Sequence, residues 1–316
     1  MKMVIAGGTG FIGRHLCKLL VTEGHSIIAL SRHYEGATAP STARSRVIQW
    51  NGREDGPWAT LCDGAEVVIN LSGAPIADTR WTPARKRELV HSRVLTTRVL
   101  LASIAKWNTK PHTFITASGV GFYGDRGPEV VNEDSSHGEG FLAELCLAWE
   151  AAAKQGEALG LRVLPVRFGM VLGLNGGALA KMAFPFRFFL GGPVLPGSQY
   201  VSWIHLKDLS RLILWLITNQ SMSGPVNGVA PDSVTMREFC AKLGQAMKRP
   251  AWFPVPGFIL RIALGELASM LTTGQRVYPK RALEGGFTFL YPELPAALVA
   301  VFAESKSQNG SADDII

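Results

Sequence analysis

Short apolar runs alternate with helical patterns along the first half of the chain. Residues 11–22 repeat apolar side chains near a period of 3.6, which predicts a helix, and the continuous apolar run at 67–71 is typical of a strand buried on both faces. The pattern also predicts strands at 2–6, 26–30, 46–50, 113–117 and 163–168, a long helix opening at Thr82-Pro83 and a helix at 141–159. This order predicts an α/β fold, a doubly wound parallel sheet with helices on both sides.

The pattern changes after about residue 170. Glycine-rich connections at 173–177 and 191–197 flank an aromatic, apolar stretch at 182–190. Further helices are expected at 210–217, 235–247 and 254–272, the last of them interrupted at Gly265. We therefore predict a smaller C-terminal lobe that closes over the sheet edge.

The same pattern gives the expected division of the chain. We predict a first domain at 1–172, to which the segment at about 200–230 adds strands, and a mostly C-terminal substrate lobe at 173–303. Residues 304–316 are polar, and we expect them to form a flexible tail.

Composition and charge narrow the class of protein. Hydrophobic residues make up 47% of the 316 and charged residues 18%, which excludes global disorder. The net charge of +7 favours anionic partners, but the basic residues are not concentrated enough to indicate nucleic acid. Phosphate-bearing small molecules explain the charge equally well, so we expect a small-molecule substrate and no nucleic-acid partner. The sequence leaves the oligomeric state open, a homodimer included.

Membrane and metal sites are not expected. The chain has no run of 18 apolar residues, and its first apolar stretch is too short for a signal peptide, so the expected location is the cytoplasm. Four cysteines lie far apart, with no Cys-x-x-Cys and no Cys/His cluster, which indicates buried hydrophobic side chains rather than a metal site or a disulfide framework.

A glycine motif follows the first predicted strand and opens the first helix. Gly7, Gly10 and Gly13 form a G-x-x-G-x-x-G pattern, which can also belong to an ordinary strand-to-helix turn. In this context glycines let the backbone approach a pyrophosphate, and the helix N-terminus offers free N–H groups to it. The motif therefore predicts a dinucleotide site of the Rossmann type.

The end of the second strand indicates which nucleotide binds. NAD sites place Asp or Glu there, whereas this chain has Leu30, Ser31, Arg32 and His33. A hydroxyl with a guanidinium suits a 2′-phosphate, because arginine can bind phosphate through two parallel hydrogen bonds. We therefore expect NADP(H) as the cofactor, with a solvated Arg32 as the alternative.

These residues and several later motifs resemble one family. The chain resembles the extended short-chain dehydrogenases/reductases, and more closely their atypical epimerase-family branch, also described as sugar-nucleotide-epimerase-like or SulA-like cell-division inhibitors. The motifs that carry the resemblance span about residues 2 to 302 and include Asn70–Gly73, Arg80–Thr82, Ser92-Arg93, Ser118–Gly124, Trp149-Glu150, Trp203–His205, Asn227–Pro231 and Pro279–Arg281.

The resemblance implies a set of cofactor contacts. Thr9, Gly10, Phe11 and Ile12 would cover the pyrophosphate, beside Gly7 and Gly13. Other implied contacts are Ser31 and Arg32 at the 2′-phosphate, Leu71, Ser72 and Gly73 at the adenine, Ala117, Ser118 and Gly119 at the nicotinamide ribose, and Arg167, Phe168 and Gly169 near the nicotinamide.

The catalytic pair of the superfamily is missing. Active members carry Tyr-x-x-x-Lys on the helix after the serine strand, and the tyrosine exchanges the proton during hydride transfer. The segment from Gly140 to Glu150 has neither residue, with Phe141 expected near the tyrosine position and Leu145 four residues on. Ser118 and Tyr123 are the candidate proton carriers in their place, although Tyr123 can equally serve packing and Ser118 is one residue off the usual register.

Two functions therefore remain open. One is an NADP-dependent oxidoreductase or nucleotide-sugar epimerase-like enzyme, which uses Ser118, Tyr123, His205 or a lysine from elsewhere in the chain. The other is a non-catalytic NADPH-binding regulatory or interaction protein, which the resemblance connects with cell division.

Substrate and packing roles are expected for several other residues. We predict that Arg80, Arg93, Trp203 and His205 contact a phosphate- or nucleotide-bearing substrate, whereas the basic run around Arg85 is more typical of a solvated helix face. Asp208 is predicted to cap the helix at 209–217. The aromatic residues of the 182–190 stretch would pack the second lobe, roof the site, or meet a membrane or a partner protein: Phe184, Phe186, Phe188 and Phe189.

Overall fold

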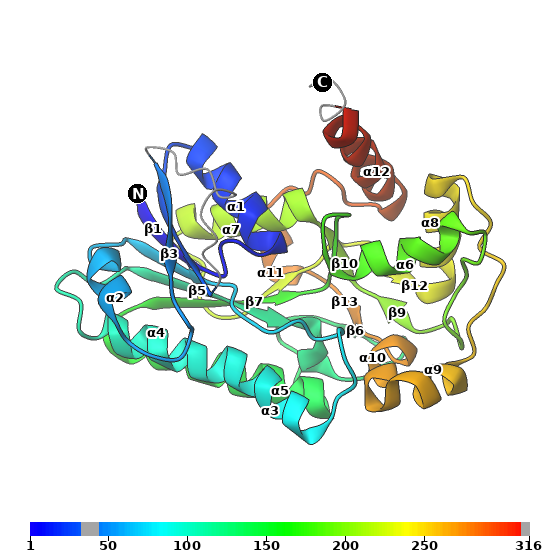
Figure 1. Ribbon diagram of the computed structural model, residues 1–316, viewed down its shortest axis with the longest axis horizontal. Helices are drawn as coiled ribbons and strands as arrows, with labels where there is room; N and C mark the ends of the chain where they lie inside the picture. Colours follow the sequence, from blue (N-terminus) through cyan, green and yellow to red (C-terminus); the bar gives the residue numbers. More distant parts are fainter. Residues whose placement is uncertain (33–43, 311–316) are drawn as a thin grey trace. The chain divides into compact units, whose positions relative to one another are not determined.

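The computed structural model describes residues 1–32 and 44–310, with side chains to residue 304. Its main sheet has seven strands in the order β11-β7-β5-β4-β1-β2-β3 (Figure 1). The strands are β1 (Lys2–Ala6), β2 (Ser26–Ser31), β3 (Ser45–Gln49), β4 (Val67–Asn70), β5 (Thr113–Gly119), β7 (Arg162–Phe168) and β11 (Val226–Gly228). The sheet is parallel, and the order reverses between β1 and β4, which confirms the predicted doubly wound Rossmann fold.

Helices cover both faces of this sheet, as the alternation of elements predicts. Figure 1 shows α1 (Phe11–Thr22) and α7 (Leu206–Thr218) on one side, and α3 (Pro83–Val90), α4 (Thr96–Ile104) and α5 (Phe141–Lys154) on the other. A short helix, α2 (Pro57–Cys62), follows β3. The long helix predicted from Thr82-Pro83 is α3 to α4, joined by a π-helical turn at His91–Leu95, and the Thr82 hydroxyl caps it by accepting from the Arg85 N–H.

Burial on both faces explains the apolar strands. Val4 and Ala6 of β1 join a core with Leu100 of α4 and Phe114 of β5. Met3 and Ile5, which point to the other face, are also fully buried. A strand with both faces covered favours apolar side chains at successive positions, and this explains the continuous apolar runs Met3–Ala6 in β1 and Val67–Ile69 in β4.

The described residues form two compact units, each built from three chain segments. Unit 1 comprises 1–122, 140–167 and 210–226, and unit 2 comprises 123–139, 168–209 and 227–316. The predicted domain limits at 172, 303 and 304 stay predictions. Helix α12 (Leu294–Gly310) continues into the segment predicted as a tail.

Unit 2 contains three two-stranded sheets and several helices. The strand pairs are β8 (Met170–Leu172) with β10 (Trp203–His205), β9 (Tyr200–Val201) with β12 (Val234–Thr235), and β6 (Val130–Val131) with β13 (Arg276–Val277). The helices are α6 (Gly177–Arg187), α8 (Met236–Met247), α9 (Gly257–Leu264), α10 (Ser269–Thr272), α11 (Lys280–Glu284) and α12. The predicted interruption at Gly265 is observed, because α9 ends there and a 3-10 turn leads to α10.

The core of unit 2 separates the aromatic residues of α6. Phe186 is 2% exposed and packs with Leu179 of the same helix and Trp203 of β10. Phe184 and Phe188 are more than half exposed. The prediction that these aromatic residues pack the second lobe is therefore confirmed for Phe186. For the exposed Phe184, Phe188 and Phe189, the alternatives of a roof over the site or a surface for a membrane or a partner protein stay predictions.

The predicted cap at Asp208 is wrong. Asp208 lies inside the first turn of α7, which begins at Leu206, and its side chain is fully buried. Its carboxylate accepts the N–H groups of Leu290 and Tyr291, at 2.8 Å each. The residue therefore holds a distant segment of unit 2 in place instead of capping its own helix.

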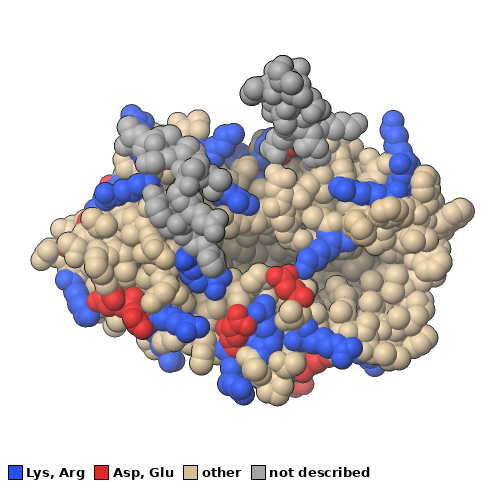
Figure 2. Space-filling model, in the orientation of Figure 1, with Lys and Arg blue, Asp and Glu red and all other residues tan. Residues whose placement is uncertain are grey.

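On the face of the protein that Figure 2 shows, the basic side chains do not gather in one patch. Figure 2 shows Lys and Arg side chains at separate places on the face in view, with Asp and Glu among them. No helix of the described residues is long and apolar enough to cross a membrane. The described residues also hold no group of three His, Cys, Asp or Glu side chains placed to bind a metal ion.

Candidate functional site

The glycine loop connects β1 to α1 in unit 1. Gly7 has φ +80°, a conformation that L side chains rarely adopt, and a Cβ atom at Gly13 would lie 2.2 Å from the Gly7 carbonyl oxygen. The N-cap of α1 is Gly10, which has no side chain to occupy the free N–H groups of the first turn. The loop therefore has the close backbone packing and the open helix N-terminus that a pyrophosphate requires.

The end of β2 contacts this loop. The Gly7 N–H donates to the Leu30 carbonyl oxygen at 2.9 Å, and the hydroxyls of Thr9 and Ser31 lie 2.7 Å apart. Arg32 follows as an exposed residue, and no carboxylate occurs at the end of this strand. The structure thus brings the predicted pyrophosphate and 2′-phosphate segments together, while His33 lies outside the described residues.

The loop after β4 is the third segment at this edge of the sheet. A Cβ atom at Gly7 would lie 3.0 Å from the Leu71 carbonyl group, so the two loops are in contact. The Asn70 side chain accepts the Ser72 N–H and donates to the Thr97 hydroxyl, which also accepts from the Trp149 indole at 3.0 Å. A buried polar network, of which the sequence indicated only the Asn70 end, therefore fixes the predicted adenine loop.

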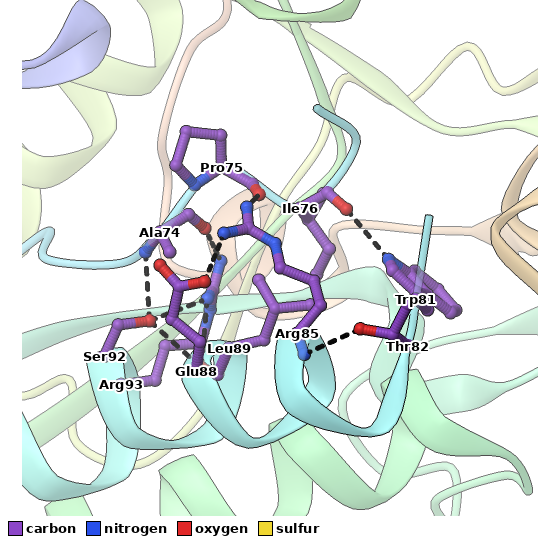
Figure 3. A network of polar contacts seen from close by, with 10 residues as sticks. All are labelled: Ala74, Pro75, Ile76, Trp81, Thr82, Arg85, Glu88, Leu89, Ser92 and Arg93. Atoms are coloured by element: carbon purple, nitrogen blue, oxygen red, sulfur yellow. Dashed lines mark hydrogen bonds and ion pairs between the residues drawn. The ribbon is translucent and has the colours of Figure 1, made fainter. Parts of the chain in front are cut away.

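The Arg93 guanidinium packs against Gly73 in the loop after β4, where a Cβ atom would lie 3.1 Å from it. It donates to the carbonyl oxygens of Ala74 and Leu89 at 3.0 and 3.2 Å (Figure 3). Burial lowers the pKa of Arg93 to about 10, and no ion pair with a carboxylate is observed for it in the described part of the chain. The group is a half-buried cation that keeps unused N–H donors.

A side chain of α3 holds the segment between β4 and α3 in place through a hydrogen bond. Arg85 donates to the Pro75 carbonyl oxygen and pairs with Glu88 at 2.6 Å, while the Trp81 indole donates to Ile76 at 2.9 Å (Figure 3). Arg85 therefore has structural contacts and is not a freely solvated side chain. Arg80 lies in the same segment and is exposed.

The first candidate hydroxyl belongs to a buried cluster in unit 1. The Ser118 hydroxyl donates to Glu150 Oε1 at 2.7 Å, and Arg167 pairs with both oxygens of Glu150 at 2.8 Å. The guanidinium carbon of Arg167 lies 3.5 Å from the Phe122 ring centroid. We call Ser118, Phe122, Glu150 and Arg167 the Ser118 cluster. Within this cluster the serine hydroxyl donates its hydrogen bond to the Glu150 carboxylate. Ala117, the residue before Ser118, is buried on β5.

The side chains of α5 that face β5 and the turn after it are Leu142 and Cys146, each one residue after the expected Phe141 and Leu145. A Cβ atom at Gly121 would lie 3.0 Å from the Leu142 Cβ, and the Cys146 side chain interacts with Ser118 and the Gly119 backbone. Phe141 instead packs edge-on against Trp81, with ring centroids 5.1 Å apart. Burial, together with the nearby Glu150 charge, raises the pKa of the Cys146 thiol to about 11. Leu142 and Cys146 supply neither a phenol nor an amine.

The second candidate hydroxyl belongs to a buried cluster in unit 2. The Tyr123 hydroxyl donates to Asn227 Oδ1 at 2.8 Å, and the Asn227 N–H donates to Glu133 Oε1 at 2.9 Å. Burial raises the pKa of Glu133, against the opposing effects of the Asn227 N–H and the Arg281 charge. We call Tyr123, Glu133 and Asn227 the Tyr123 cluster; its hydroxyl is fully buried and used in packing.

The remaining candidates lie in unit 2. His205 Nδ1 accepts the Lys207 N–H at 3.1 Å, and the imidazole packs against the Tyr291 ring at an interplanar angle of 38°, with centroids 4.2 Å apart. Trp203 is fully buried and donates to the Asp232 carbonyl oxygen at 2.6 Å. Gly169 is packed against Ser202, where a Cβ atom would lie 2.5 Å from the carbonyl oxygen. All three residues have contacts within the core of the unit.

Comparison with known proteins identifies the family. Residues 3–227 match the model described as NAD dependent epimerase/dehydratase family, which is well over half of the chain. The chain belongs to this family. Residues 255–301 match a second model, Domain of unknown function (DUF1731). The result confirms the resemblance to the atypical extended short-chain dehydrogenases/reductases.

Individual relatives agree with this assignment. The chain is 40% identical over 306 residues to the Epimerase family protein SDR39U1 homolog, chloroplastic, of Arabidopsis thaliana, covering 95% of this chain and 86% of that protein. The crystal structure of human epimerase family protein SDR39U1 (isoform 2) with NADPH is 35% identical, with a TM-score of 0.85 over 95% of this chain and 99% of that chain. A nucleoside-diphosphate sugar epimerase from Corynebacterium glutamicum is 30% identical, with a TM-score of 0.74 over 98% of this chain and 61% of that chain.

Proposed function

We propose that unit 1 binds NADP(H) at the carboxyl edge of its sheet. The observation that carries this proposal is the glycine loop, where the Gly7 conformation and the space beside Gly13 exclude side chains. The Thr9–Ser31 contact joins this loop to a strand end that lacks the carboxylate of NAD sites. The human relative crystallised with NADPH supports the same cofactor.

In this proposal each loop at the carboxyl edge of the sheet binds a different part of the cofactor. Thr9 to Ile12 and the first turn of α1 bind the pyrophosphate, and Ser31 and Arg32 bind the 2′-phosphate. Leu71, Ser72 and Gly73 lie along the adenine, and Ala117 and Ser118 along the nicotinamide ribose. Arg167 acts through Glu150 as a positioning residue, because its guanidinium is already paired there. The cofactor, once bound, supplies hydride chemistry.

Thermal stability measured with NADPH and with NADH tests this proposal. A ligand that binds only the folded chain stabilises it by about 2.7 kcal/mol at 100 times its dissociation constant. We expect a clear rise in Tm with NADPH and a much smaller rise with NADH at equal concentration. No shift with either nucleotide would contradict the proposal.

A glycine variant connects the measurement to the loop. Gly13→Ala places a methyl group against the Gly7 carbonyl oxygen, so we expect it to abolish the NADPH shift and to lower the free energy of unfolding by about 3 kcal/mol. Gly56→Ala is the matched control, since its Cβ atom would make an ordinary contact of 3.5 Å with Trp58. If NADPH still raises the Tm of Gly13→Ala as it does that of the wild type, the glycine loop is not part of the binding site.

Two roles for the bound nucleotide are supported by different observations. The relative named as a nucleoside-diphosphate sugar epimerase supports turnover of a nucleotide-linked sugar, with Arg93 and Arg80 as the cations that meet its phosphates. The buried contacts of Ser118 and Tyr123 support a non-catalytic NADPH-binding regulatory protein instead, because neither hydroxyl is available to a substrate.

Incubation of the protein loaded with NADP⁺ and UDP-glucose separates the two roles. In an enzyme of the epimerase type the sugar hydroxyl-bearing carbon gives its hydride to the oxidised nicotinamide, so either the epimer forms, as followed by NMR, or reduced nicotinamide accumulates, as followed by absorbance. A non-catalytic binder changes neither while it retains the thermal shift. Arg93→Gln should weaken UDP-glucose binding only if the first role is correct. The cytoplasmic location and the oligomeric state stay predictions.

A further inference from the structure

Unit 2 exposes a group of large apolar side chains that the proposed function does not use. They come from the end of α6, from the segment before α9, and from α9 itself. Each is at least 46% exposed, and Ile262 reaches 74% and Trp252 72%. We call the following nine residues the aromatic surface: Phe184, Phe188, Phe189, Leu190, Trp252, Phe253, Phe258, Ile259 and Ile262.

Backbone and ring contacts hold the first two of these elements together. The rings of Phe184 and Phe188 meet edge-on at 5.2 Å, and the Trp252 indole donates to the Phe189 carbonyl oxygen at 3.0 Å. The Phe253 N–H donates to the Gly191 carbonyl oxygen at 3.1 Å. The two chain segments therefore lie side by side.

Helix α9 begins four residues after Phe253 and adds exposed apolar side chains of its own. Gly257, its first residue, lies against the Leu195 carbonyl oxygen, where a Cβ atom would be 3.1 Å away. Phe258 and Ile262 are one turn apart and share a face of this helix, and α9 has no buried residue. The helix thus presents apolar side chains outward instead of packing them inside unit 2.

These segments have few polar side chains, which argues against a protein partner on this surface. Residues 184–193 and 251–264 contain no Asp, Glu, Asn, Gln, Ser or Thr, and their only charged residues are Arg187 and Arg261. The Trp252 N–H is already used within the unit. Protein interfaces carry about one hydrogen bond per 100–200 Å² and a mixed polar rim, whereas the charged side chains of these segments and of the residues just before 251 are all basic.

The sign of the charge argues against a second copy of the chain. Lys248 and Arg249 precede the 251–264 segment, and the Arg249 guanidinium lies 4.6 Å from the Phe189 ring centroid. A two-fold dimer through this surface would bring each basic group toward its own equivalents. An occupant that is apolar inside and anionic at its boundary fits better.

We propose that the aromatic surface docks on an anionic lipid bilayer. The aromatic and aliphatic side chains enter the boundary between headgroups and acyl chains, and Arg187, Arg249 and Arg261 meet lipid phosphates. Such binding lies in the plane of the interface.

Co-sedimentation of the full chain with vesicles tests this proposal. Vesicles of phosphatidylcholine with phosphatidylglycerol are compared with vesicles of phosphatidylcholine alone. We expect binding to the anionic vesicles and at least tenfold weaker binding to the neutral ones. Failure of the wild-type chain to sediment with anionic vesicles would overturn the proposal.

Two double variants connect binding to the surface. Phe188→Ser with Phe258→Ser should weaken binding to anionic vesicles at least tenfold. Arg187→Glu with Arg261→Glu should remove the preference for anionic over neutral vesicles. The matched controls are Val299→Ser, which is 61% exposed on α12, and Arg98→Glu on α4; both should bind as the wild type does.

Folding and self-association are measured on the same samples. Circular dichroism and Tm identify variants that have not folded, and the charge variant, altered only at exposed positions, keeps the test decisive if the apolar variant unfolds. Binding that is unchanged in both double variants would overturn the proposal. So would a dimer, seen by light scattering, that Phe188→Ser with Phe258→Ser dissociates while no vesicle binding occurs.

Discussion

The Ser118 cluster of unit 1 and the Tyr123 cluster of unit 2 each enclose a hydroxyl that the sequence marks as a candidate proton carrier. In the first, Glu150 is balanced by Arg167, whose side chain is 4% exposed. In the second, Glu133 accepts a backbone N–H, and burial raises its pKa. The motif thus supplies two hydroxyls, and each donates a hydrogen bond within the fold: Ser118 to a carboxylate that is ion-paired with Arg167, and Tyr123 to the neutral amide of Asn227.

Breaking the ion pair should have the largest effect. Glu150→Gln keeps the shape of the side chain but leaves the Arg167 guanidinium buried without a counter-charge, so we expect the free energy of unfolding to fall by about 3 kcal/mol. Urea denaturation measures this loss. Asp55→Asn is the matched control, because its pair with Lys106 is solvent-exposed and should contribute at most about 1 kcal/mol. Equal losses in the two variants would contradict a buried, charge-balanced cluster.

Removing the tyrosine hydroxyl should have a smaller effect. Tyr123→Phe leaves Asn227 Oδ1 without its donor, which we expect to lower the free energy of unfolding by about 1 kcal/mol. NADPH affinity should not change, because the hydroxyl is used in packing. Tyr278→Phe, at a residue that is 42% exposed, should have almost no effect on stability. If Tyr123→Phe loses NADPH binding while its stability is unchanged, the tyrosine hydroxyl takes part in the cofactor site.

The smallest effect concerns the dependence of stability on pH. The pKa of Glu133 is raised in the folded chain, so the fold favours the protonated carboxyl, and the associated stability is lost as pH rises above the ordinary value of 4.5. Glu133→Gln removes this loss, and its Tm relative to wild type should increase from about pH 4.5 toward neutral pH. Glu144→Gln, at an exposed position on α5, is the control and should follow the wild-type pH profile. A constant difference between Glu133→Gln and wild type at all pH values would contradict the raised pKa.

Local rules explain what the sequence predicts correctly. The strand runs, the glycine loop, the Thr82 cap and the break at Gly265 each depend on neighbouring residues, so they can be recognised in a single sequence. The contact between Thr9 and Ser31 follows from the same local order, since Thr9 lies in the loop after β1 and Ser31 ends the adjacent strand β2.

Long-range contacts explain what the sequence does not predict. Tyr123 and Asn227 are 104 residues apart, and Asp208 and Leu290 are 82 residues apart, so neither partner is visible in a local pattern. Glu150 and Arg167 belong to segments that match the family, but the sequence of these segments does not show that the two residues form an ion pair. The helical period of Leu179, Ala183 and Phe186 could have separated the buried phenylalanine from its exposed neighbours.

NADP(H) binding at the carboxyl edge of unit 1 is tested by the affinity of the Arg32→Ala variant for the two nucleotides. Fluorescence titration of the wild type and the variant gives Kd for NADPH and for NADH. Because Arg32 is proposed to meet only the 2′-phosphate, we expect NADPH to weaken at least tenfold while NADH changes little. Equal weakening of both nucleotides, or no change in either, would contradict the assignment of Ser31 and Arg32 to the 2′-phosphate.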